Sequence, residues 1–460
     1  MHKVRFSIKY KVGSIWNSNL RQYASSILIA TLISRMLGYI REVLMAVYFG
    51  TSIATDAWLM ASVLPNLLFG SLYGAVSNLV IPLYLEAKNS QKRQYANRFI
   101  QEIFTLLTAV ALLLSVIAYF CTPIIVHGFA PGFAGAQYHL TVTMTRIMLP
   151  TFVFWLWAGL FSALLQALNL YGPPAWAPVL LNIIRILFII TLSRVIGIEG
   201  VAWGFTAGVG LQLLVLFWVL SKNTINFKFR LSLQHPLMKK FIRLVNPVIL
   251  ASLMGSLGII VDRIFASELE IGTIAALNYS YLIIQLPIGL IVLPIITPLF
   301  TSLSQKIVQC RYKEWSNLLS KSLWLLGTVM AIITLIIIIL SNPIIGLIYQ
   351  HGAFGHQSTL LTSEILPYFA IGLITMALSS LLLKALVSLQ YTSSLSIWTM
   401  VATGTNILAD FLLVHPLQGR GLALGTSLAN IVYAVGLAFS LRRAIKLRMR
   451  NIHQSNVSIS

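Results

Sequence analysis

Several arginine residues lie within long apolar stretches of this sequence. Arg41 and Arg263 each interrupt such a stretch, and each has an acidic neighbour, Glu42 and Asp262. An ionised side chain inside a membrane is costly unless it faces a wet cavity or a partner. The planar, permanently charged guanidinium group suits phosphate or diphosphate. We therefore predict a cationic cavity for an anionic ligand; the alternative is that these arginines form buried ion pairs that hold helices together.

Other charged residues share this apolar setting. The basic ones are Arg35, Arg146, Arg185 and Lys384. The acidic ones available to balance all of these arginines and the lysine are Glu42, Asp56, Asp262, Glu364 and Asp410. The remaining excess of positive charge favours an anionic ligand over purely internal pairing.

A second group of polar residues lies near the C-terminal end. Asn406 and Asp410 are one helical turn apart, and Thr426 follows in the next apolar segment. Hard oxygen ligands at this spacing suit Na⁺ or a proton relay, so a coupling ion is one interpretation. A hydrogen bond that packs two helices is the other.

The histidines and the two cysteines show no metal-ligand spacing, and no nucleophile–base pair indicates catalysis.

Composition restricts the class of protein. Of the 460 residues, 58% are hydrophobic and only 9% are charged, which excludes an ordinary soluble enzyme and a disordered chain. An all-α polytopic membrane protein remains, with about 12 transmembrane helices. The predicted spans are 22–49, 53–85, 99–127, 140–168, 174–194, 200–221, 241–267, 273–304, 316–349, 359–390, 394–414 and 421–441.

The net charge of +21 follows the predicted topology. Most Lys and Arg residues fall in clusters that twelve spans would place on one side of the membrane, which makes both termini cytoplasmic. The N-terminal cluster precedes an apolar run without a cleavage site, so we expect a retained first span. The excess charge thus reflects topology and attraction to anionic lipids, without nucleic acid. The clusters lie in 1–21, 88–98, 222–243, 306–321 and 442–450.

The two halves of the chain resemble each other. An offset of 222 places Arg41 on Arg263, Gly50 on Gly272 and Pro65 on Pro287, while Asn182 meets Asn406 at 224. Six spans in each half make the repeat parallel, with its axis along the membrane normal. We predict two six-helix lobes, residues 1–221 and 241–460, joined by a cytoplasmic linker, 222–240. Such lobes typically surround a central cavity that opens alternately to either side.

The sequence resembles a known family in motifs along almost the whole chain. Among them are SRMLGYIRE (34–42), FGTSIATDAW (49–58), TRIMLP (145–150), DRIFAS (262–267), QLPIGL (285–290) and GRGLALGTS (419–427). These stretches are similar to the MurJ (MviN) family of lipid II flippases, which belongs to the multidrug/oligosaccharidyl-lipid/polysaccharide exporter superfamily. The resemblance implies a bacterial cytoplasmic membrane protein that moves a lipid-linked anionic glycan and is not an enzyme.

The resemblance also implies roles for particular residues. Substrate-binding charges would be Arg35, Arg41, Asp56, Arg146 and Arg263. A cation site would comprise Asn406, Asp410 and Thr426. The sequence departs from the family pattern at three places. Phe69-Gly70 and Tyr73 replace charged residues, Tyr281-Leu282 stands where an Asp-Arg pair is usual, and twelve spans are expected here where the family usually has fourteen.

Those departures leave other functions open. A flippase for a different lipid-linked polysaccharide fits the same residues. A cation-coupled exporter of small amphiphiles would prefer acidic over basic cavity residues, and a membrane glycosyltransferase or phosphatase would need clustered acids or histidines.

The sequence contains no nucleotide-binding loop. We therefore expect the membrane potential to drive the cycle, with Na⁺ or H⁺ as a possible coupling ion and no other cofactor.

Overall fold

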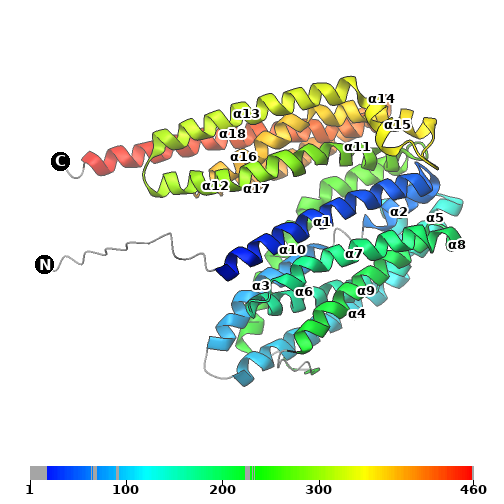
Figure 1. Ribbon diagram of the computed structural model, residues 1–460, viewed down its shortest axis with the longest axis horizontal. Coiled ribbons are helices and arrows are strands. Elements are labelled where there is room, and N and C mark those ends of the chain that lie inside the picture. Colours follow the sequence, from blue (N-terminus) through cyan, green and yellow to red (C-terminus); the bar gives the residue numbers. More distant parts are fainter. Residues whose placement is uncertain are drawn as a thin grey trace. The chain divides into compact units, whose positions relative to one another are not determined.

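The protein is entirely helical in the part of the chain that the structure describes (Figure 1). The computed structural model describes residues 18–63, 65, 70–89, 93–222, 228–230, 232 and 234–457. The predicted N-terminal basic cluster therefore lies mostly outside the described residues, as does part of the linker. The helices are α1 (Ser18–Phe49), α2 (Ile53–Ala61), α3 (Gly70–Asn89), α4 (Arg93–Phe129), α5 (Gly135–Met148), α6 (Thr151–Ala167), α7 (Gly172–Ile190), α8 (Ser193–Ile196), α9 (Glu199–Ser221), α10 (Pro236–Ser267), α11 (Thr273–Pro287), η2 (Ile288–Val292), α12 (Leu293–Val308), α13 (Tyr312–Ile339), α14 (Ser341–Tyr349), α15 (His356–Ile371), α16 (Leu373–Ser388), α17 (Leu395–Leu417) and α18 (Gly419–Val457).

The helices confirm a polytopic membrane protein. Among the described residues, eight helices are long and apolar enough to cross a membrane, and α15 with α16 makes a ninth if the pair forms one span bent by 41°. Each coincides with one of the twelve predicted spans. The predicted spans 22–49, 53–85 and 241–267 correspond to α1, to α2 with α3, and to α10; they are helical where described but do not meet this criterion.

The described helices pack into two compact units that interleave along the chain. The first contains α1 up to Arg41, α3, α4 up to Val116, α6 to α9, and α10 up to Val248. Within it, α7 packs on α9 and α3 packs on α6. The second contains the remainder of α1, α4 and α10 with α2, α5 and α11 to α18. Here α18 packs on both α16 and α17, and α11 packs on α15. The lobes 1–221 and 241–460 stay a prediction from the repeat.

Equivalent asparagines occupy equivalent places in the two halves. Asn182 of α7 faces Gly38 of α1, where an added Cβ would lie 4.0 Å from the amide, and it donates to the Ser34 carbonyl at 3.1 Å. Asn406 of α17 faces Gly258 of α10, where an added Cβ would lie 3.0 Å from the amide oxygen. A side chain at Gly258 would crowd the amide, whereas one at Gly38 would only touch it. This correspondence supports the internal repeat.

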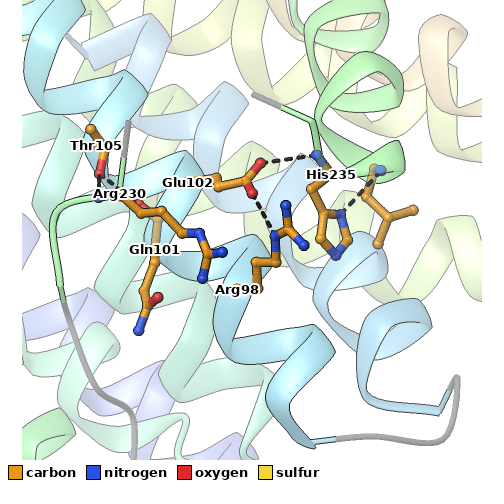
Figure 2. A network of polar contacts seen from close by, with 7 residues as sticks. Arg98, Gln101, Glu102, Thr105, Arg230 and His235 are labelled. Carbon is orange, nitrogen blue, oxygen red and sulfur yellow. Dashed lines mark hydrogen bonds and ion pairs between the residues drawn. The ribbon is translucent and has the colours of Figure 1, made fainter. Parts of the chain in front are cut away.

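The chain leading into α10 is fixed to α4 by a buried carboxylate (Figure 2). Glu102 is fully buried; its Oε2 accepts the backbone N–H of His235 at 3.0 Å, and its Oε1 accepts Arg98 Nε at 2.9 Å. Burial lowers the pKa of His235, which keeps the imidazole neutral at pH 7. Its Nδ1 can therefore accept the Leu237 N–H at 3.3 Å. Upstream, the Arg230 N–H donates to Thr105 Oγ1 at 2.8 Å.

We expect Glu102→Ala to release this segment and destabilise the first unit by about 1–3 kcal/mol, because a buried N–H and a guanidinium would lose their acceptor. Hydrogen exchange over residues 228–240 and thermal unfolding in detergent measure the effect. Glu86→Ala is the matched control. Its carboxylate pairs with Lys240 at 2.6 Å, but both side chains are half exposed, so its loss should cost less than about 1 kcal/mol. Equal effects of the two substitutions would contradict the role of Glu102 in fixing this segment to α4.

Candidate functional site

Arg41 is held by a neighbouring amide in the first unit. Its Nη1 donates to Asn182 Oδ1 at 3.1 Å, across α1 and α7. The amide cannot turn freely, because its Nδ2 donates to the carbonyl oxygens of Ser34 and Pro178, each at 3.1 Å. Three contacts therefore orient one guanidinium group, and a fixed guanidinium loses less entropy when it binds a ligand.

The remaining basic residues of the first unit have different surroundings. Arg35, on the same helix as Arg41, is exposed. Arg185 of α7 is buried, with its guanidinium carbon 4.9 Å from the centre of the Phe205 ring. The carboxylates of this unit that lie near the linker, Glu86 and Glu102, pair with Lys240 and Arg98. Of the predicted cations here, Arg41 therefore has the most ordered polar environment.

Arg263 of α10 contacts the backbone of a neighbouring helix in the second unit. Its Nη1 donates to the Ile274 carbonyl at 3.4 Å, which links α10 to α11. Asp262, Asp56 and Glu42 all act on its charge. Negative charges near a guanidinium stabilise its charged form and also reduce the net charge that it offers to an anion.

Asp56 contacts backbone rather than a cationic side chain. This buried carboxylate on α2 accepts the Gly272 N–H at 2.6 Å and the Ala275 N–H at 2.8 Å. Both N–H groups belong to the first turn of α11, where backbone donors lack helical partners and the helix dipole favours negative charge. Asp56 thus caps α11 from another helix. Gly272 has φ +90°, a conformation that side-chain-bearing residues rarely adopt.

Arg146, on α5 of the second unit, lies apart from Arg263 and the polar residues of α17. Its guanidinium carbon is 4.7 Å from the centre of the Tyr119 ring, a cation–π arrangement. It lines neither of the two cavities described for this unit.

The residues predicted as a cation site do come together. Asn406 Nδ2 lies 3.0 Å from Asp410 Oδ2 and 3.2 Å from Asp262 Oδ1, so one amide bridges two carboxylates. Asp410 is fully buried, and its Oδ1 has no hydrogen-bond partner among the described residues. Thr426 and Asn406 line one cavity of about 560 Å³ together with Asp262. Two carboxylates that share one amide N–H₂ group, with a hydroxyl lining the same cavity, suit a shared proton or Na⁺.

Sequence reasoning missed part of this arrangement. Asp262 was noted only as a neighbour of Arg263, yet it shares Asn406 with Asp410. The contact of Asn182 with Arg41 was also missed, although the alignment of Asn182 with Asn406 was a usable signal. The tyrosines Tyr281 and Tyr433, which line the same cavity, were not recognised as candidate site residues.

The fold defines the class of protein first. The chain is similar to a multidrug resistance MATE family transporter of the MOP superfamily in an inward-facing conformation, with a TM-score of 0.74 over 92% of this chain and 99% of that one, at 14% identity. It therefore has the helical fold of that transporter. The sequence profile described as lipid II flippase MurJ matches residues 45–458. The chain belongs to the MurJ lipid II flippase family, whose members are transporters and not enzymes.

Individual relatives agree with this assignment. A solved structure of lipid II flippase MurJ, in an inward closed conformation, has a TM-score of 0.79 at 28% identity, covering 90% of this chain and 87% of that one. The lipid II flippase MurJ of Burkholderia cenocepacia is 28% identical over 90% of this chain and 82% of its own length. A probable lipid II flippase MurJ of Buchnera aphidicola is 28% identical over 90% and 81%.

Proposed function

We propose that this protein translocates lipid II, a polyprenyl-diphosphate-linked glycan precursor, across the bacterial cytoplasmic membrane by alternating access. The observation that carries the proposal is Arg41, a guanidinium group fixed by Asn182 within a helix of a MurJ-family chain. Arg41 and its repeat-related counterpart Arg263 are the arginines that we propose as diphosphate ligands. Arg35 and Arg146 supply further positive charge, and Asp56 acts through the position of α11.

The proposed activity has a direct test. We expect the chain to sustain growth of a bacterium whose own lipid II flippase is depleted, because Arg35, Arg41, Asp56, Arg146 and Arg263 lie in stretches that match the family. Purified protein in vesicles should also move labelled lipid II between leaflets. Protein carrying Arg41→Ala serves as the inactive control in both assays. Growth failure together with no lipid II movement by well-inserted wild type would contradict the proposal.

A flippase for another lipid-linked polysaccharide is the second candidate. The observation that favours it is Tyr281, an aromatic residue lining the cavity of the second unit at a position where the resemblance leads us to expect a charged pair. The same vesicle assay distinguishes the two candidates when the glycan on the lipid is varied.

Both termini are proposed to be cytoplasmic, from the one-sided placement of Lys and Arg. A reporter that is active only in the cytoplasm, fused after Arg450, should therefore be active. A second fusion at Gly355, between α14 and α15, should be inactive because that connection is predicted to be external. The opposite pattern would overturn the orientation.

The cation site is proposed to bind Na⁺ or H⁺ and to adjust the cycle. Its support is the bridge that Asn406 makes between Asp262 and Asp410, next to Thr426. Since Asp262 adjoins Arg263, occupancy by a cation would alter the field at the proposed diphosphate site.

A further inference from the structure

Neutral polar and aromatic side chains make up half of the lining of one cavity in the second unit, the cavity that Asn406 and Thr426 also line. Its volume of about 560 Å³ lies within the usual range for small-molecule sites. The walls come from α10, α11, α17 and α18, with one residue of α15. The side chains that matter below are Asn278, Tyr281, Thr403, Asn406, Asn430 and Tyr433.

The same pair of residues occurs on two of these helices. Asn278 and Tyr281 are three residues apart on α11, and Asn430 and Tyr433 are three apart on α18. Residues at this spacing share one helical face. Each helix therefore presents an amide beside a phenol ring to the cavity.

Much of the hydrogen-bonding capacity of this lining is unused within the protein. Among the described residues, no hydrogen bond involves the side chains of Asn278, Thr403 or Tyr433. Asn430 donates once, from Nδ2 to the Thr426 carbonyl at 2.8 Å, so its amide oxygen still accepts. Amides and hydroxyls supply both donors and acceptors, and these face the space of the cavity.

Charge on the walls selects for a neutral ligand. In the described part of the chain, the charged residues lining the cavity are Asp262 and Arg263, which are adjacent and of opposite sign. Because these two charges cancel, the lining as a whole offers no net charge to an ionic ligand, and its other polar groups are neutral. A sugar ring combines hydroxyl groups that donate and accept with apolar C–H faces that pack on aromatic rings. The hydroxyl groups of a sugar would bond to the amides and hydroxyls of this cavity, and its apolar face would pack on the two tyrosine rings.

We propose that this cavity is a saccharide subsite that holds the glycan of the lipid-linked substrate. This proposal rests on the proposed function and extends it, since the arginines bind diphosphate while Asn278, Asn430 and the two tyrosines bind sugar. Asp56 positions the α11 wall by capping its first turn. The subsite thus determines which glycan is carried.

A comparison of two lipids, one with and one without sugar, distinguishes binding at the saccharide subsite from binding at the diphosphate site. Binding of lipid II and of sugar-free polyprenyl diphosphate is measured on the purified full-length protein by native mass spectrometry. We expect Asn278→Ala and Asn430→Ala each to weaken lipid II binding about tenfold and Tyr433→Phe about threefold, with sugar-free lipid unchanged. Arg41→Ala should weaken both lipids equally. Asn342→Ala, an exposed asparagine at the start of α14, is the matched control.

Some outcomes would overturn the saccharide subsite, and one would test the subsite independently of the proposed flippase activity. If the asparagine variants weaken both lipids equally, or leave lipid II binding unchanged, the cavity is not a sugar site. Competition by tetraphenylphosphonium, lost in Tyr433→Ala, would make it an organic-cation site instead. If wild type binds neither lipid, the proposed function fails, and the disaccharide chitobiose decides alone. Chitobiose binding that Asn278→Ala weakens supports the subsite, and its absence in wild type rejects it.

Discussion

Arg41→Ala should reduce transport of the lipid-linked substrate about 100-fold or more while leaving membrane insertion intact. Truncating one partner of a desolvated charge pair costs about 2–5 kcal/mol, much of it from the charge left unpaired. Here that charge would be the proposed diphosphate. Complementation of a flippase-depleted strain and initial flipping rates in vesicles measure the loss.

Three variants make this result specific to Arg41. Arg41→Lys keeps the charge but loses the planar fork, so we expect intermediate activity. Asn182→Ala removes the acceptor that orients Arg41 and should lower activity less than Arg41→Ala does. Arg194→Ala, on an exposed arginine of α8, is the matched control and should be near wild type. Wild-type transport by Arg41→Ala would remove the cationic cavity from the mechanism.

Arg263→Ala tests the second arginine that we propose as a diphosphate ligand. Because Asp262, Asp56 and Glu42 act on this guanidinium, its removal also leaves carboxylates without their neighbour. We therefore attribute part of any loss to local destabilisation. Arg263→Lys retains the charge and separates the two effects.

Long apolar runs made most of the fold predictable. In a membrane, a helix satisfies the backbone N–H and C=O groups of such a run internally, so the positions of the spans follow from the sequence alone. Breaks within spans were harder to foresee. The predicted span 359–390 bends by 41° between α15 and α16, where the Gly372 N–H donates to Ser427 Oγ of α18 at 3.1 Å. Such a contact depends on a helix distant in sequence.

Charges in apolar segments were predictable as site candidates, but their partners were not. Arg41 was conspicuous because an isolated charge there is expensive, whereas its partner Asn182 lies 141 residues away in the chain. Asp56 looked like a binding residue, yet its carboxylate caps α11, 216 residues away. Local sequence does not encode which distant backbone a carboxylate will cap. Only the internal repeat offered a long-range signal.

Transport should depend strongly on membrane potential. An anionic headgroup moving outward is assisted by an inside-negative potential, by about 2.3 kcal/mol per charge per 100 mV. Return of the empty cationic cavity is favoured by the same field. For a headgroup of about two charges the assistance exceeds 4 kcal/mol at 100 mV, which is large enough to dominate the cycle. Vesicles with an imposed potassium-diffusion potential, inside negative, should therefore transport faster than depolarised vesicles.

Asp410→Asn determines whether a cation drives or only adjusts this cycle. The substitution keeps the size of the buried side chain and removes the ionisable carboxyl group beside Asn406, so the proposed site would lose its affinity for Na⁺ or H⁺. If potential is the driver, the variant keeps its response to an imposed potential, and activity changes only a few-fold with or without Na⁺. Thr405→Ala, on the same helix but outside the cavity lining, controls for damage to α17. Loss of transport confined to Asp410→Asn, with wild type indifferent to potential, would instead make the cation at Asp262, Asn406 and Asp410 the main source of energy.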